Sequence, residues 1–146
     1  MKKFILLSIF ALMFSGFSYS QCNDQLVNLC AMSTDGATYI KDFKARMKKA
    51  KKNEPAPVAK YSVVLNKNTV YRFNVCNANE FPGKAIIQLY DAESMLGSNY
   101  NVATGKDYPS FDFYCKKSGI YQVFMSFKGG EEGCAAGIMS FVGKEY

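Results

Sequence analysis

Histidine is absent from all 146 residues of the sequence. Because histidine is the commonest general base and metal ligand near neutral pH, its absence disfavours sites that depend on an imidazole. A serine or cysteine nucleophile would lack its usual activating base. No two cysteines are closer than eight positions apart, which does not fit the ligand spacing of a zinc site. The sequence therefore predicts a protein that is not an enzyme, with no metal ion and no cofactor.

Long apolar runs are equally scarce. After the first twenty residues, no apolar segment is long enough to span a membrane. The first twenty residues combine the basic start Lys2 and Lys3, an apolar run over 4–14, and the small residues Ser18 and Ser20. This order is typical of a secretory signal peptide, so we expect cleavage after Ser20. The sequence thus predicts an exported protein, either periplasmic or extracellular, including the cell surface.

Removal of residues 1–20 leaves a chain that suits one domain with one core. All five cysteines survive the cleavage and meet an oxidising compartment, in which disulfides persist. Because five is an odd number, at least one thiol is free or joins two chains. The sequence does not choose among the pairings, although bonds from the first two cysteines would attach an N-terminal helix to the rest of the domain. The candidates are Cys22, Cys30, Cys76, Cys115 and Cys134.

Residues 21–59 are predicted to form an N-terminal helical arm and a connector. Asp24 can cap a short first helix, and an amphipathic second helix is expected over about 37–52. Pro55 and Pro57 then stop the helix and favour an extended connector. The apolar face of the second helix is predicted from Tyr39, Ile40, Phe43, Met47 and Ala50.

Residues 60–146 are predicted to form the main domain, because the apolar pattern there changes to a period of two. Short strands separated by turn signals, without helices between them, indicate a mainly β protein with an antiparallel, jelly-roll-like β-sandwich. Alternate side chains, among them Phe73, Val123 and Ile138, are expected between the two sheets. The last three strands are expected to form a meander. Strands are predicted over 61–65, 69–76, 85–90, 95–102, 111–115, 120–127 and 134–142.

Three short segments, 65–73, 87–91 and 113–123, resemble the small bacterial β-sandwiches of the pre-peptidase C-terminal type. Members of that type usually accompany a secreted enzyme and serve as accessory or binding modules. The resemblance implies a sandwich fold and an exported, non-catalytic binding role. Nothing enzymatic precedes the sandwich in this sequence, so the resemblance supports the fold more than the function.

Positive charge is concentrated between Gly36 and Lys52, where seven basic residues accompany a single acidic residue, Asp42. One interpretation is an electrostatic contact with an anionic lipid or envelope surface, an acidic glycan or an acidic protein partner. The alternative is a helix that docks on the sandwich and leaves its lysines solvated. Nucleic acid is a poor partner, since the chain is exported and no aromatic residues interleave the lysines. The lysines predicted to make contact are Lys44, Lys48, Lys49, Lys51 and Lys52.

A second candidate contact is the segment 99–109, which is long for a connection between strands. It combines aromatic rings with amide, carboxylate and ammonium groups, the chemistry that binds sugars, and loops often carry function. The alternative is an ordinary turn with partly buried tyrosines. The residues predicted to make contact are Tyr100, Asn101, Asp107 and Tyr108.

Together, these features predict a non-catalytic exported binding or envelope-associated module that contacts a glycan, an anionic surface or a protein partner. One alternative is a structural or accessory subunit of a secreted or envelope complex, joined through an exposed strand edge or the spare thiol. A further alternative is a small hydrolase that uses a pair of carboxylates.

Overall fold

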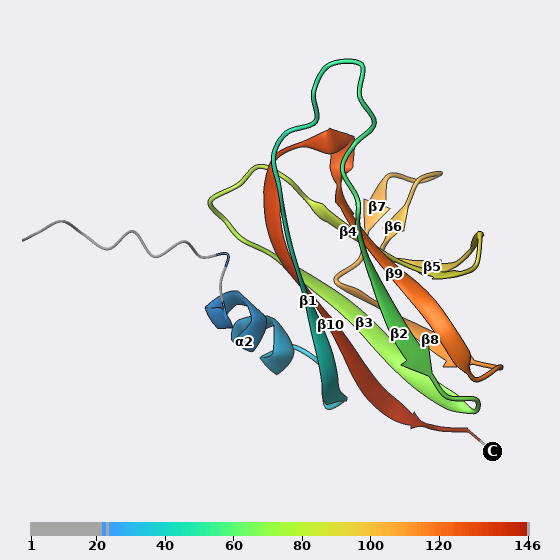
Figure 1. Ribbon diagram of the computed structural model, residues 1–146. Coiled ribbons are helices and arrows are strands. Elements are labelled where there is room, and N and C mark those ends of the chain that lie inside the picture. Colours follow the sequence, from blue (N-terminus) through green and yellow to red (C-terminus); the bar gives the residue numbers. More distant parts are fainter. Residues whose placement is uncertain (1–21, 23, 146) are drawn as a thin grey trace, which may run out of the picture.

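The computed structural model describes residue 22 and residues 24–145 of the chain; the predicted signal peptide lies outside the described residues. One helix and a series of antiparallel strands make up the fold (Figure 1). No helix in the described part of the chain is long and apolar enough to cross a bilayer. The elements are α2 (Asp24–Met32), β1 (Thr38–Met47), β2 (Ala59–Leu65), β3 (Thr69–Asn77), β4 (Ala85–Asp91), β5 (Ser94–Ser98), β6 (Tyr100–Asn101), β7 (Lys106–Asp107), β8 (Ser110–Cys115), β9 (Gly119–Phe127), the 3₁₀ turn η2 (Lys128–Gly130) and β10 (Gly133–Lys144).

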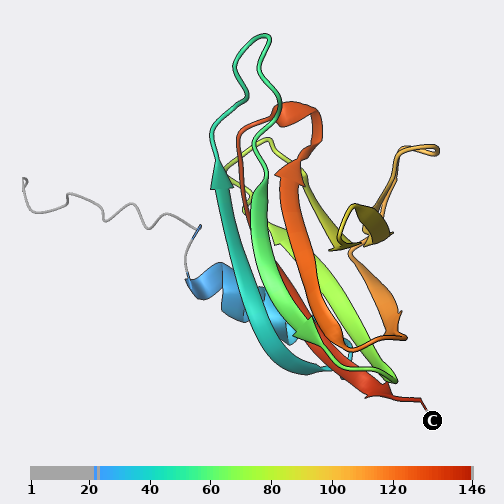
Figure 2. The same ribbon diagram turned by 45° about the vertical axis from the view of Figure 1, so that its right-hand side comes forward.

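The strands form two four-stranded sheets and one small ribbon. Sheet A has the order β1-β10-β3-β8, sheet B has the order β2-β9-β4-β5, and β6 pairs with β7. All the pairings are antiparallel. The sheets enclose an apolar core, and α2 packs on the other face of sheet A (Figure 2). The prediction of a mainly β, antiparallel sandwich with an N-terminal helix is therefore confirmed.

The core follows the two-residue period of the strands. Phe73 on sheet A and Val123 on sheet B are fully buried between the sheets. Ile138 is also fully buried, but it lies on the outer face of sheet A, against Val27 and Cys30 of α2. Its predicted place between the sheets is therefore wrong. Central strand β10 is apolar on both faces because the second sheet covers one face and the helix covers the other.

The predicted helix over 37–52 is wrong, because residues 38–47 form strand β1. This strand pairs along its length with β10, a partner that a local pattern does not reveal. The apolar residues of this segment fit both the period of a helix, about 3.6 residues, and the period of a strand, two residues. In the structure, Phe43 and Ala45 are buried at alternate positions, whereas Tyr39 and Ile40 are 46% and 43% exposed. The hydrogen-bonded pairing with β10, which extends over the whole of β1, favours the strand over the helix.

The predicted meander of the last three strands is also wrong. Strand β8 lies at the edge of sheet A, β9 lies inside sheet B, and β10 returns to the middle of sheet A. A turn signal marks where the chain reverses, but it does not show whether the next strand stays in the same sheet. In this fold the chain crosses between sheets at most of its turns, and β4 and β5 form the only hairpin within the two described sheets.

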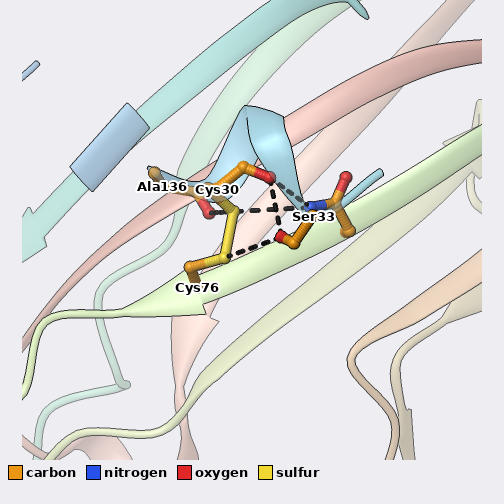
Figure 3. Close-up of a disulfide and its surroundings, with 5 residues drawn as sticks. Cys30, Ser33, Cys76 and Ala136 are labelled. Carbon is orange, nitrogen blue, oxygen red and sulfur yellow. Dashed lines mark hydrogen bonds between the residues drawn. A yellow bond between two sulfur atoms is a disulfide. The ribbon is translucent and has the colours of Figure 1, made fainter. Parts of the chain in front are cut away.

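Two disulfides attach the N-terminal segment to sheet A. Cys22 bonds to Cys134 and Cys30 bonds to Cys76, each pair with a Cα–Cα separation of 5.7 Å. Figure 3 shows Cys30 at the end of the helix, where its carbonyl oxygen accepts a 2.8 Å hydrogen bond from the Ser33 hydroxyl. Cys22 and Cys30 therefore attach the helix to the sandwich, which is one of the arrangements that the sequence left open.

Cys115 is the free cysteine of the described residues, and it is fully buried. Its thiol donates a hydrogen bond to the Lys117 carbonyl oxygen at 3.2 Å, and the Tyr121 hydroxyl donates to the same oxygen at 2.5 Å. Burial raises the pKa of Tyr121 to about 12, and the neighbouring Cys115 adds to the effect. A thiol in this position does not reach another chain without local opening, so the structure gives no support to an intermolecular disulfide.

Candidate binding surface at one end of the sandwich

Four of the five predicted contact lysines lie on one loop. Residues 48–58, which we call the basic loop, connect β1 to β2 and extend well beyond the end of both sheets (Figures 1 and 2). The loop exists because β1 and β2 belong to different sheets, so the chain must cross from one sheet to the other. Pro55 and Pro57 favour an extended return to β2. The basic loop is therefore not a helix face but a protruding connection.

The base of the basic loop is anchored to the turn between β9 and β10. The Ala50 amide donates a 2.7 Å hydrogen bond to the Gly130 carbonyl oxygen. Gly130 has a positive φ of 66°, and a Cβ added there would lie 2.7 Å from the Ala50 Cβ, so the close approach requires glycine. Lys49 adds an ion pair with Glu131, with an N–O distance of 3.5 Å. These contacts position the loop on a rigid support.

The remaining lysines of the loop face solvent. Lys48, Lys51 and Lys52 are exposed and form no ion pair with any of the described residues. Glu54 is the single acidic residue of the loop sequence. The loop therefore presents three lysine ammonium groups that form no ion pair with a carboxylate of the described residues.

Lys44 lies apart from this loop. It sits within β1, where its Nζ lies 2.8 Å from Asp24 Oδ1 at the start of α2. The hydrogen bond and charge of Asp24 raise the pKa of Lys44, and Lys44 in turn lowers the pKa of Asp24. Lys44 thus links helix to sheet, and the structure does not bring it together with the other four lysines.

The second predicted segment, 99–109, contains the small β6-β7 ribbon. The side chain of Asn101 accepts hydrogen bonds from the backbone amides of Ala103, at 3.0 Å, and Thr104, at 3.3 Å. It shapes the turn of the ribbon. Tyr108 is 43% exposed and Asp107 is exposed, so both are accessible to a ligand.

Lys128 joins the two predicted segments, and the sequence did not single it out. Its Nζ lies 2.5 Å from Asp107 Oδ2 and 4.2 Å from the centroid of the Tyr100 ring. Lys128 belongs to η2, the same turn whose Gly130 anchors the basic loop. The loop and the ribbon therefore lie on either side of one turn. Gly129 and Gly130 indicated a turn after Lys128, but the sequence did not indicate which segments this turn would contact.

Beside the ribbon, an open hollow of about 370 Å³ lies between the ends of the two sheets. Its lining mixes apolar groups with amide, ammonium and carboxylate side chains. The lining residues are Val75, Asn77, Lys84, Ala85, Asn99, Asp107, Tyr108 and Pro109.

No group of three or more cysteine, aspartate or glutamate side chains within residues 24–145 is placed to hold a metal ion. The carboxyl groups whose pKa is lowered, Asp24 and Asp112, each owe the shift to one basic partner, Lys44 and Arg72 respectively. Both pairs connect structural elements.

Comparison with known proteins adds a structural neighbour. No protein-family model matches the chain, and no curated protein matches it. The chain is similar to the crystal structure of PliG from Aeromonas hydrophila, a periplasmic inhibitor of g-type lysozyme, with a TM-score of 0.53 and 11% identity. The match covers 74% of this chain and 90% of that chain. At this identity the likeness shows a shared fold, and the resemblance to the pre-peptidase C-terminal type stays a prediction.

Proposed function

We propose that the chain is an exported, non-catalytic module that binds a protein partner through the basic loop. The observation that carries this proposal is the loop itself, which protrudes from the sandwich and is anchored at Ala50 and Gly130. Three of its lysines, Lys48, Lys51 and Lys52, are exposed and form no ion pair with the described residues. Loops held on a rigid scaffold are frequent sites of recognition. Export is supported by the two disulfides, which persist in oxidising compartments, and by the signal-peptide pattern of residues 1–20.

The shape and charge of the loop define the class of partner. A protruding, lysine-rich loop complements a concave, acidic surface. The cleft of a glycoside hydrolase has this character, because a pair of carboxyl groups flanks the bond that it cleaves. A solved structure that shares this fold belongs to an inhibitor of g-type lysozyme. We therefore propose the substrate cleft of a lysozyme-like glycoside hydrolase as the surface that the basic loop enters.

The test measures how fast a g-type lysozyme clears a suspension of bacterial cell walls in the presence of the purified chain. We expect the wild-type chain to slow clearing, and the variant K48E/K49E/K51E/K52E to lose the effect because its loop is acidic. Raising the salt concentration from 0.1 M to 1 M should also weaken inhibition, since the Debye length falls from about 10 Å to about 3 Å.

A matched control reverses four lysines at the opposite end of the sandwich, in K67E/K116E/K117E/K144E. These residues are exposed and lie in the β2–β3 turn, in the β8–β9 turn and at the end of β10. This variant has the same net charge as the loop variant and should inhibit like wild type. A wild-type chain that neither binds the lysozyme nor slows it would overturn the proposed partner.

A further inference from the structure

The hollow beside the β6-β7 ribbon has walls that are fixed by the two sheets. Val75 and Asn77 lie at the end of β3 in sheet A, and Lys84 and Ala85 lie at the start of β4 in sheet B. The segment 107–109 crosses between them. The Val75 amide donates a 3.1 Å hydrogen bond to the Pro109 carbonyl oxygen, and the Tyr108 amide donates a 2.8 Å bond to the Asn99 carbonyl oxygen. These main-chain hydrogen bonds fix the backbone that lines the hollow.

Two asparagines of the hollow have different roles. Asn99 is 2% exposed, and its side chain bonds to the main chain of Ile87, Ala85 and Tyr108 at 2.8–3.3 Å. Its amide fixes the backbone and is not free for a ligand. Asn77 uses its Oδ1 to accept the Ala85 amide at 2.8 Å, and its Nδ2 makes no hydrogen bond with the described residues. Asn77 therefore offers one oriented donor to whatever occupies the hollow.

The charged groups favour an anion. Asp107 is paired through Oδ2 with Lys128, which neutralises it. Lys84 is exposed and forms no ion pair with the described residues. The hollow and its rim therefore carry net positive charge, and Lys84 supplies an ammonium group for a charge-assisted hydrogen bond.

From this arrangement we infer that the hollow binds a sugar that carries a carboxylate. The Tyr108 ring packs on the apolar face of the pyranose, Asn77 Nδ2 donates to a hydroxyl, and Lys84 pairs with the carboxylate. The volume of about 370 Å³ lies within the range of about 300–1,000 Å³ that is usual for small-ligand sites. This site is separate from the protein-binding role proposed for the basic loop and does not depend on it.

The test is a titration of the isotopically labelled chain followed by amide NMR shifts, with methyl β-D-glucuronide and methyl β-D-glucoside as probes. The two glycosides differ only at C6, which is a carboxylate in the glucuronide and a hydroxymethyl group in the glucoside. We expect shifts at Ala85, Asn99 and Tyr108, and an affinity for the glucuronide about tenfold higher than for the glucoside. K84Q should remove this preference, whereas Y108A should weaken both sugars about equally. K116Q, which changes an exposed lysine outside the hollow, should behave as wild type.

The outcome that overturns the inference is an equal affinity for the two glycosides in the wild-type chain, or shifts confined to residues outside the hollow. Because Lys84 is exposed, we expect K84Q to keep the fold. Comparison of its amide spectrum with that of the wild-type chain checks this within the same experiment. The variant K48E/K49E/K51E/K52E should bind glucuronide like wild type. Loss of lysozyme inhibition and loss of sugar binding are therefore separate results, and either proposal can fail alone.

Discussion

The outer faces of the two sheets are built in opposite ways. The outer face of sheet A is covered by α2, is cross-linked by Cys30–Cys76 and Cys22–Cys134, and buries Ile138 completely. No helix of the described residues covers the outer face of sheet B. Its cross-strand neighbours Val64 and Ile120 are 66% and 69% exposed. One face is therefore an internal layer of the fold, and the other is molecular surface.

The polar and aromatic groups of sheet B bond to one another instead. The side chains of Ser62 and Gln122 hydrogen-bond across β2 and β9 at 3.0 Å. The rings of Tyr90 and Phe124 stack with centroids 4.5 Å apart, and Lys60 Nζ lies 4.8 Å from the Phe124 ring. Such cross-strand pairs contribute about 0.2–1 kcal/mol each. Sheet B therefore stabilises its outer surface by pairs between neighbouring strands, whereas the outer face of sheet A is covered by a helix that two disulfides hold in place.

Removal of a disulfide from the covered face of sheet A should lower the free energy of unfolding more than any other change considered. The variant C30A/C76A opens a loop whose ends are 46 positions apart in the sequence. Loss of a native disulfide typically costs about 2–5 kcal/mol, because the unfolded chain regains conformational entropy. We expect the free energy of unfolding, measured by denaturant titration, to fall by about that amount. A change below about 0.5 kcal/mol would mean that packing and the remaining Cys22–Cys134 bond hold α2 without this cross-link.

The same substitution placed on each face gives the sharpest comparison. Ile138→Ala removes a fully buried side chain beneath α2, and such truncations cost about 2–5 kcal/mol. Ile120→Ala removes a side chain that is 69% exposed, and surface changes usually stay within about 0.5 kcal/mol. Thermal and denaturant unfolding of both variants should show this difference. Equal losses would mean that the outer face of sheet B is covered in solution.

The smallest expected effect concerns pH. Arg72 binds Asp112 through two hydrogen bonds of 2.7 and 2.8 Å on the outer face of sheet A, and donates a third bond to the Thr34 carbonyl oxygen at 3.1 Å. Arg72 lowers the pKa of Asp112 below its ordinary value of 3.8. The pair therefore contributes stability above about pH 4, and this contribution is lost as the pH falls through the lowered pKa.

Because Asp112 is partly exposed, solvent screening limits the contribution to about 1 kcal/mol or less. The measurement compares the free energy of unfolding of wild type and D112N between pH 7 and pH 2. The two curves should converge in acid, since protonated Asp112 and asparagine are both neutral. A constant gap at all pH values would show that the pair acts through packing and not through charge.

The fold was predictable where burial alternates along one strand. The period of two over β3, β4 and β9 gave those strands directly, because one face of each strand lies in the core. The period failed in β1, where the exposed Tyr39 and Ile40 imitate a helix face. It also failed to assign Ile138 to the correct layer, since a residue buried by a helix and one buried by a sheet look alike in sequence.

The candidate surface was predictable in composition but not in geometry. The lysine cluster and the segment 99–109 were each visible in the sequence as unusual combinations of side chains. Their meeting at η2 depends on Lys128 and Gly130, which lie far from both in the sequence. Lys44 belonged to the same cluster by composition, yet β1 carries it to Asp24. Side-chain direction along a strand and crossings between sheets are tertiary properties, and a local pattern does not contain them.

The position of β10 also sets the order of events as the chain folds. Strands β1 and β3 do not pair with each other; both hydrogen-bond to β10, which comes after every other strand described. The pairings of β1 and β3 with β10 therefore cannot form until residues 133–144 have been synthesised. The Cys22–Cys134 bond, which spans 112 positions, also cannot close before then. Proteins dominated by such distant pairings fold slowly, over milliseconds to seconds. For an exported chain, we expect sheet A to stay incomplete until residues 133–144 have also crossed the membrane.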